Sequence, residues 1–175
     1  MTENKITQID FTESLFFQDL EVSKELEEYV RSISLTSIDH VKTSFYGDQQ
    51  DEKLIELVMK IVEPFFIEVG KKLNNKGMQI LKMWVQKYEK NNYHPIHVHE
   101  THHFSYSFVF YIDCTDTSAC TVFYTPGYPY VDHTTFKLEP KKGRCVIFPG
   151  AMPHEAMPNS DTSRLIVSGN IQFTR

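Results

Sequence analysis

Residues 143–154 have the sequence Gly143-Arg144-Cys145-Val146-Ile147-Phe148-Pro149-Gly150-Ala151-Met152-Pro153-His154. The apolar run from Cys145 to Phe148 predicts a short buried strand, and the Pro149-Gly150 pair predicts the turn that ends it. His154 then lies in a proline-rich turn at the mouth of that strand. The segment therefore predicts a β structure that carries a histidine at its open end.

The same alternation of short strands and turns extends over the second half of the chain. The turns are marked by Pro126-Gly127, Pro140-Lys141-Lys142-Gly143 and Pro158-Asn159. Most of the 13 Phe and 9 Tyr residues belong to this half, as is typical of strands. The strand-like segments are residues 78–88, 104–113, 120–124, 134–138, 144–148 and 164–173. We therefore predict a mainly β fold, either a sandwich or a jelly roll.

The first 77 residues predict a supporting layer for this β unit. A strand-like stretch ends near Phe17, and a helix is expected over residues 22–34, where Ser23 could act as its N-cap. Residues 36–48 are polar and irregular. An apolar stripe predicts a second helix over about residues 50–75, which Pro64 could kink or break. We expect one domain over residues 1–175, with both helices packed on one face of a core formed by residues 78–175.

Composition and charge exclude several classes of function. The formal net charge is -5 and there is no basic stripe, which argues against a nucleic-acid partner. No apolar run approaches the roughly 20 residues of a membrane span, and the first residues do not resemble a signal peptide. The odd number of cysteines (Cys114, Cys120 and Cys145) predicts reduced thiols. We therefore expect a cytoplasmic protein; its oligomeric state is left open.

Five of the eight histidines fall between His94 and His103. In a strand, His97 and His99 would project to the same face, so both rings could reach one metal ion. His154 could supply a third ligand and leave coordination positions open for substrate. His94, His102 and His103 are either ordinary surface or core histidines, or residues that line the mouth of the site or contact substrate. His40 and His133 have no partners in sequence and are expected at the surface.

A late arginine suggests that the metal site has an anionic partner. Arg164, Ile166, Ser168 and Asn170 share one face of the predicted strand. If that face is internal, the buried guanidinium requires an anion such as a ligand carboxylate. Tyr111 either packs its ring in the sheet or places its hydroxyl at the same carboxylate. On the strand before the histidines, Trp84, Gln86 and Tyr88 also share a face, which either packs in the core or walls the pocket.

At these residues the chain resembles the iron(II)- and 2-oxoglutarate-dependent oxygenases, above all the prolyl-hydroxylase-like branch and short members from bacteria and phages. The resemblance covers about residues 78–173. It rests on His97-Val98-His99, Val109-Phe110-Tyr111-Ile112-Asp113, the 143–149 segment, His154 and Arg164.

This resemblance implies a double-stranded β-helix that binds one Fe(II) through His97, His99 and His154. 2-Oxoglutarate would chelate the metal, and its far carboxylate would pair with Arg164, helped by Tyr111 and Ser168. O2 would be consumed, succinate and CO2 released, and an unactivated C–H bond hydroxylated. The substrate pocket would include Trp84, Tyr88, His103 and Asn170. The substrate itself, a small molecule or a peptide or protein side chain, is not predicted.

Two positions depart from the family pattern. The family has His-x-Asp/Glu, and His99 replaces the carboxylate here; Glu100 could serve instead only if the strand bulges there. Ile166 stands where many relatives carry a small hydroxyl residue, a part that Ser168 could take from the same face. The first departure keeps open a three-histidine cupin-type dioxygenase that needs no 2-oxoglutarate.

A non-enzymatic jelly-roll binding module is the third possibility. Its binding face would be the aromatic loop from Tyr124 to Tyr130. The same loop could equally select substrates in an enzyme, so it does not separate the possibilities.

Overall fold

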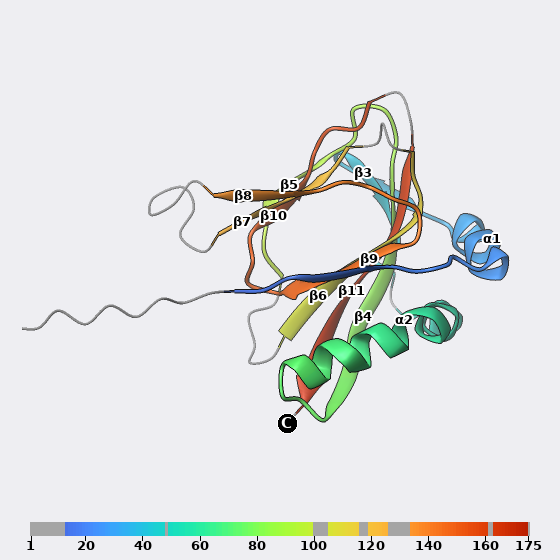
Figure 1. Cartoon of the computed structure of the whole chain (residues 1–175). Helices are drawn as coiled ribbons and strands as arrows, with labels where there is room; N and C mark the ends of the chain where they lie inside the picture. Colours follow the sequence, from blue (N-terminus) through green and yellow to red (C-terminus); the bar gives the residue numbers. More distant parts are fainter. Residues whose placement is uncertain are drawn as a thin grey trace, which may run out of the picture.

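The computed structural model describes residues 13–47, 49–99, 105–115, 119–125, 134–160 and 163–174. The elements in these ranges are two helices and eleven strands (Figure 1). The helices are α1 (Lys24–Ser32) and α2 (Glu52–Lys72). The strands are β1 (Phe16–Asp19), β2 (Thr36–Ile38), β3 (Val41–Thr43), β4 (Gly77–Tyr88), β5 (His94–His97), β6 (Ser105–Asp113), β7 (Thr121–Tyr124), β8 (Thr135–Leu138), β9 (Arg144–Pro149), β10 (His154–Ala156) and β11 (Arg164–Thr174).

The strands form two antiparallel sheets. The larger sheet has the order β1-β9-β6-β11-β4-β3-β2, and the smaller has the order β5-β10-β7-β8. The smaller sheet faces the larger one, while the helices lie beyond the larger sheet on its other side (Figure 1). This arrangement is the double-stranded β-helix, or jelly roll, so the predicted fold class is confirmed.

Strand alternation gives the larger sheet two buried faces. Phe108 and Phe110 of β6 belong to the core shared with the helices, whereas Val109 and Tyr111 belong to the core between the sheets. A strand covered on both faces needs apolar residues at consecutive positions. This explains why β6 and β9 are continuous apolar runs and not alternating ones.

The two helices begin at side-chain caps and bury one stripe each. Ser23 caps α1 as predicted, accepting a hydrogen bond of 3.2 Å from the Leu26 amide, and Asp51 caps α2 through the Leu54 amide at 2.9 Å. α2 continues through Pro64, so of the two effects considered for this proline a break does not occur. Buried residues of both helices share one cluster with the larger sheet. Neither helix of the described chain is long and apolar enough to cross a membrane.

The sequence prediction missed a hairpin at the edge of the larger sheet. β2 and β3 pair within residues 36–43, a segment predicted to be irregular. The turn between them is Asp39-His40, where Asp39 has a φ of 45°, a left-handed conformation that Asp tolerates. Tertiary pairing forms these strands, because Thr43 lies opposite Gln86 of β4. The hairpin places residues 38–46 beside the histidines.

The three cysteines of the chain are all unpaired, as the odd count predicted.

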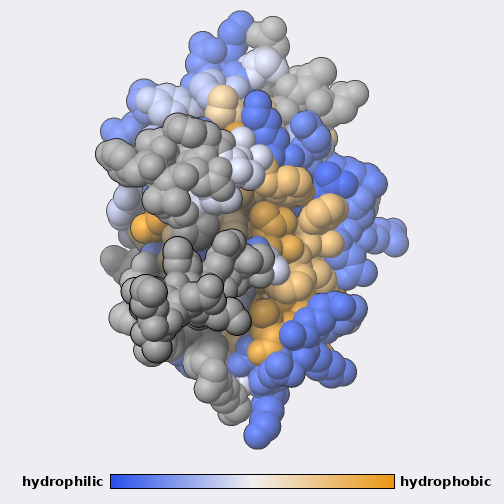
Figure 2. Space-filling model, turned by 60° about the vertical axis from the view of Figure 1, so that its left-hand side comes forward, coloured by the Kyte–Doolittle hydropathy of each residue, from blue (hydrophilic) through white to orange (hydrophobic). Residues whose placement is uncertain are grey.

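Several large apolar residues remain at the surface, among them Phe17, Ile67 and Phe136. Figure 2 shows a face on which hydrophobic residues gather in one band, with hydrophilic residues along its right-hand side. Part of the apolar character of the chain therefore stays outside the two cores.

We expect Gly169→Ala to lower the free energy of unfolding by about 1–3 kcal/mol, the usual effect of an overpacked core. A Cβ at Gly169 would lie 2.4 Å from Cε1 of Phe108 and 2.8 Å from the Lys82 carbonyl oxygen. Urea unfolding measures the change. Gly47→Ala is the matched control, since its Cβ would meet only the Ser44 carbonyl oxygen at 3.4 Å. Equal stabilities of the two variants would contradict the prediction.

Candidate metal centre

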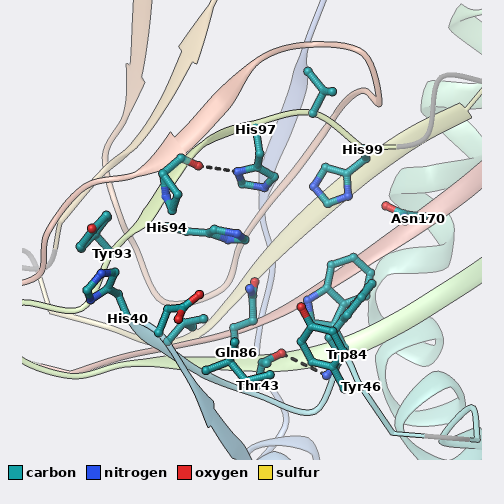
Figure 3. A pocket seen from close by; sticks show the side chains of 16 residues that line it. His40, Thr43, Tyr46, Trp84, Gln86, Tyr93, His94, His97, His99 and Asn170 are labelled. Carbon is teal, nitrogen blue, oxygen red and sulfur yellow. Dashed lines mark hydrogen bonds between the residues drawn. The ribbon is translucent and has the colours of Figure 1, made fainter.

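Three histidines from two segments that lie far apart in the sequence meet at the open end of the jelly roll. One ring nitrogen from each of His97, His99 and His154 lies within 4.8 Å of the others. His97 ends β5 and lies opposite His154, the first residue of β10 (Figure 3 shows His97 and His99). β5 ends at His97, so His99 follows the strand, contrary to the expectation that both belong to one strand. Its backbone is held by a hydrogen bond from the His99 amide to the Gly150 carbonyl at 2.8 Å.

Backbone carbonyls orient two of the three rings. Nδ1 of His97 lies 2.8 Å from the Pro95 carbonyl oxygen, and Nδ1 of His154 lies 3.0 Å from that of Met152. A carbonyl oxygen only accepts, so each Nδ1 carries the proton and each Nε2 keeps a free lone pair. Nε2 of His154 lies 3.3 Å from Nε2 of His99. In metal sites, a histidine that binds the ion through one ring nitrogen is usually oriented in this way by a hydrogen bond from its other ring nitrogen.

Burial keeps these imidazoles uncharged. It lowers the pKa of His99 to about 4 and that of His94 to about 4, and neighbouring histidines add to the effect. The pKa of His97 is lowered for the same reason, and that of the more deeply buried His154 falls well below its usual value. Neutral imidazole is the form that binds metal ions, so the site is in its ligand form at neutral pH.

We expect the metal-free protein to lose stability as the pH falls from 7 to 5.5. In this range the unfolded chain, with an ordinary histidine pKa near 6.5, binds more protons than the folded chain, so the free energy of unfolding decreases. Carboxyl groups stay largely ionised there, because their usual pKa is about 4. Thermal unfolding should show a melting temperature several degrees lower at pH 5.5, and His94→Asn should reduce the slope. A melting temperature that rises over this range would contradict the prediction.

Arg164 is buried behind the histidines with part of its guanidinium unpaired. Its side chain is 1% exposed, as expected for the internal face of β11. Nη1 donates to the Ala119 carbonyl, and the guanidinium carbon lies 4.3 Å from the centre of the Tyr88 ring. Within the described part of the chain, Nε and Nη2 have no hydrogen-bond partner. A buried cation with free donors requires an anion, because isolated burial of a charge is costly.

The hydroxyl groups predicted to assist Arg164 have protein partners. The Tyr111 hydroxyl shares a hydrogen bond of 2.6 Å with Oγ1 of Thr121, and burial raises the pKa of Tyr111. Ser168 donates to Oε1 of Gln86 at 3.1 Å. Thr121 was not predicted as a site residue. Its place at the start of the 120–124 strand was the available signal, but the sequence does not show which face of that strand is internal.

A small cavity of about 30 Å³ connects the histidines to Arg164. Thr121, Ser168 and Gln86 line it. Tyr88, expected in the substrate pocket, also lines this inner cavity, where its ring covers the guanidinium. Burial raises the pKa of Tyr88 to about 12, so its hydroxyl stays protonated.

A larger cavity of about 630 Å³ opens on the outer side of the histidines. Trp84 and Asn170, both predicted pocket residues, line it. The Trp84 ring stacks on His99 with centroids 5.9 Å apart, and Asn170 forms a hydrogen bond with His99 and accepts another from Ser107 at 3.0 Å. His94 also lines this cavity and stacks on His97 at 3.9 Å, in keeping with its expected place at the mouth (Figure 3).

Several predicted residues lie outside the described ranges. These are Glu100, His102, His103, His133 and most of the aromatic loop that follows Tyr124.

Comparison with known proteins connects this geometry to one family. Residues 82–170 match the sequence model of the 2OG-Fe(II) oxygenase family. No curated protein gives a significant match.

Three solved structures illustrate the similarity in fold. The chain is 12% identical to an oxidoreductase of the 2OG-Fe(II) oxygenase family from Burkholderia pseudomallei, with a TM-score of 0.68 over 85% of this chain and 76% of that one. It is 15% identical to a Pseudomonas putida prolyl-4-hydroxylase, with a TM-score of 0.63 and 94% coverage of both. It is 13% identical to the epimerase SnoN in complex with Fe3+, alpha-ketoglutarate and nogalamycin RO, with a TM-score of 0.68 over 91% and 79%.

These identities are low, so the three structures support the fold and leave the reaction open, since a hydroxylase and an epimerase share it. The family match covers more than half of the chain and includes residues 82–88 of β4, the three histidines and Arg164. The protein therefore belongs to the 2OG-Fe(II) oxygenase family.

Proposed function

We propose that the protein is an Fe(II)- and 2-oxoglutarate-dependent dioxygenase that hydroxylates an unactivated C–H bond of a still unidentified substrate. The observation that carries this proposal is the buried Arg164 guanidinium, whose Nε and Nη2 have no partner in the described chain, behind three converging imidazoles. A metal site alone explains the histidines. Only an anion that reaches inward from the metal explains the arginine as well.

The donor set fits the metal that the family uses. His97, His99 and His154 would hold the ion through three neutral nitrogens, and imidazole suits iron among other metals. Three protein ligands leave coordination positions open. Bound Fe(II) and 2-oxoglutarate would supply the oxidising chemistry, in which O2 is consumed and succinate and CO2 are released. Compared with two histidines and a carboxylate, this ligand set makes the site one charge more positive.

The residues around Arg164 would hold the far carboxylate of 2-oxoglutarate. Nε and Nη2 can form a two-pronged contact with it, which suits the planar guanidinium. Tyr88 and the Ala119 carbonyl fix the orientation of that guanidinium. The inner cavity of about 30 Å³ has room for only a few water molecules. Binding of a five-carbon dicarboxylate therefore requires the lining side chains to move outward. Thr121 and Ser168 offer hydroxyl groups in the cavity between the histidines and Arg164.

The test separates binding from turnover. Trp84 is the single tryptophan of the chain and stacks on His99, so its fluorescence should report Ni(II) binding at the three histidines. Calorimetry on the Ni(II)-loaded protein should then show 2-oxoglutarate binding, and the Fe(II)-loaded protein should convert 2-oxoglutarate to succinate in air. Absence of both 2-oxoglutarate binding and succinate formation in protein that binds metal would overturn the proposal.

The second candidate is a three-histidine dioxygenase that binds its substrate directly to iron and needs no 2-oxoglutarate. His99 in the carboxylate position favours it. The same calorimetry separates the two functions, because only the first predicts 2-oxoglutarate binding to the Ni(II) form. A chain that binds neither metal nor 2-oxoglutarate would instead support the non-enzymatic binding module.

A further inference from the structure

One wall of the outer cavity, whose volume is about 630 Å³, lies outside residues 82–170, the part of the chain that matches the family. The hairpin β2–β3 and the turn after it, residues 38–46, form one side, and β4 and β5 form the others. Figure 3 shows His40, Tyr93 and His94 on one side of this space and Trp84 and Tyr46 on the other, with His97 and His99 at its end. Its volume is in the usual range for a small-molecule site, roughly 300–1,000 Å³.

The first wall is a continuous row of aromatic rings. Tyr46 meets Phe45 at a centroid distance of 5.1 Å, Phe45 meets Trp84 at 4.9 Å, and Trp84 meets His99 at 5.9 Å. Ser44 holds the outer part of this row in place. Its amide donates to the Val85 carbonyl at 3.0 Å, and its hydroxyl accepts from the Val85 amide at 3.0 Å. The turn that carries Phe45 and Tyr46 is therefore tied to β4, which carries Trp84.

The opposite wall is built from two stacked pairs. His40 and Tyr93 stack with centroids 4.3 Å apart, and His94 and His97 stack at 3.9 Å. The Tyr93 amide donates to the His40 carbonyl at 3.2 Å, which ties the hairpin turn to the segment before β5. His40 therefore has a partner that the sequence did not reveal. Each of the two walls ends on a histidine of the metal site, so the space between the walls leads to that site.

The formal charge on the lining of the outer cavity is negative. Among the described residues that line it, Asp39 is the one with a formal charge, and no lysine or arginine belongs to the lining. The nearby Lys82 places its Nζ 3.9 Å from the centre of the Phe45 ring but is not part of the cavity surface. Aromatic faces attract cations, and a carboxylate at the rim adds to that attraction.

We propose that this cavity binds the primary substrate and selects a small molecule with a flat ring that is neutral or positively charged, in preference to an anion. This proposal rests on the proposed function, because a substrate in this cavity would face the metal only if the three histidines bind one. The aromatic walls supply the affinity for the ring, and Asp39 supplies the preference among charges.

Four probes test this selection. Phenethylamine, phenethyl alcohol and 3-phenylpropionate share a phenyl ring and differ in charge, whereas butylamine is a cation without a ring. Binding is measured by calorimetry on protein loaded with Ni(II) and 2-oxoglutarate, and again on metal-free protein. At low salt we expect phenethylamine to bind at least about tenfold more tightly than either 3-phenylpropionate or butylamine, with part of the difference from the anion lost at high salt.

Two variants assign the selection to residues. Asp39→Asn should reduce the preference for the cation over the anion by about fivefold and leave phenethyl alcohol unchanged, because Asn also tolerates the left-handed backbone of that turn. Tyr46, which is 65% exposed, can be truncated without disturbing the core. Tyr46→Ala should weaken all three ring probes several-fold and butylamine little.

Tighter binding of 3-phenylpropionate, or no binding of any ring probe, would overturn the inference and favour an anionic or a polypeptide substrate. The metal-free arm keeps this result separate from the proposed function. If 2-oxoglutarate fails to bind while the ring probes keep their order, the proposed function is wrong and the substrate pocket stands.

Discussion

Replacing Arg164 by methionine is expected to raise the Kd of the Ni(II)-loaded protein for 2-oxoglutarate by at least about 100-fold. Removing one partner of a buried charge pair costs about 2–5 kcal/mol, which corresponds to a factor between about 30 and several thousand. Methionine keeps much of the volume and removes the charge together with the two free donors, Nε and Nη2. Calorimetry measures the change, and the metal affinity, read from Trp84 fluorescence, should stay within a few-fold of the original.

The stability of Arg164→Met is expected to be unchanged or higher, in contrast to its loss of 2-oxoglutarate affinity. Without an anion, the wild-type protein buries a guanidinium that is only partly paired, and an apolar replacement of a buried charge is often neutral or stabilising. Arg164→Met should therefore unfold at the same or a higher temperature than the wild type when 2-oxoglutarate is absent. Addition of 2-oxoglutarate to the Ni(II) form should raise the melting temperature of the wild type but not that of Arg164→Met.

Arg144→Met is the matched control, because Arg144 belongs to β9 but pairs with Asp19 at 2.8 Å away from the cavities. Its 2-oxoglutarate affinity should be unchanged. If both arginine variants bound 2-oxoglutarate as the wild type does, Arg164 would have a purely structural role.

His154→Ala is expected to weaken Ni(II) binding by more than about 100-fold. Loss of an outer partner of a metal ligand already costs about 10- to 100-fold, and here one of three direct ligands is removed. His97 and His99 alone would leave an ion with two protein nitrogens. The quenching of Trp84 fluorescence by Ni(II) should disappear in the micromolar range, and succinate formation should disappear with it.

The burial of His154 requires a second variant. Its ring lies 4.6 Å from that of Phe148 and 5.9 Å from that of Phe123, so truncation leaves a space in the core between the sheets. His97 is less buried, and His97→Ala should lose metal affinity to a similar extent with a smaller loss of stability. His40→Ala is the control for a histidine outside the site. Retention of tight Ni(II) binding in both the His97 and His154 variants would exclude the three-histidine centre.

Most of the β core and the grouping of His97, His99 and His154 could be predicted from the sequence. The strands of the larger sheet follow from apolar runs and turn residues, which are local signals. Strand alternation also predicted that Arg164, Ser168 and Asn170 share one face, and the structure places that face toward the cavities. The pairing of β2 and β3 was not predictable in this way, because their few polar residues become strands only beside β4.

The sequence by itself determined a mainly β fold with three histidines that could reach one ion and an arginine that shares a strand face with Ser168 and Asn170, because the period of a strand and the burial of its apolar face are encoded residue by residue. Only the tertiary structure decided which atoms complete the site. The Pro95 and Met152 carbonyls orient the imidazoles, Tyr88 covers Arg164, and residues 38–46 close the outer cavity. These are contacts between separate segments, or depend on the exact path of the backbone at a turn, and no pattern along the chain encodes them.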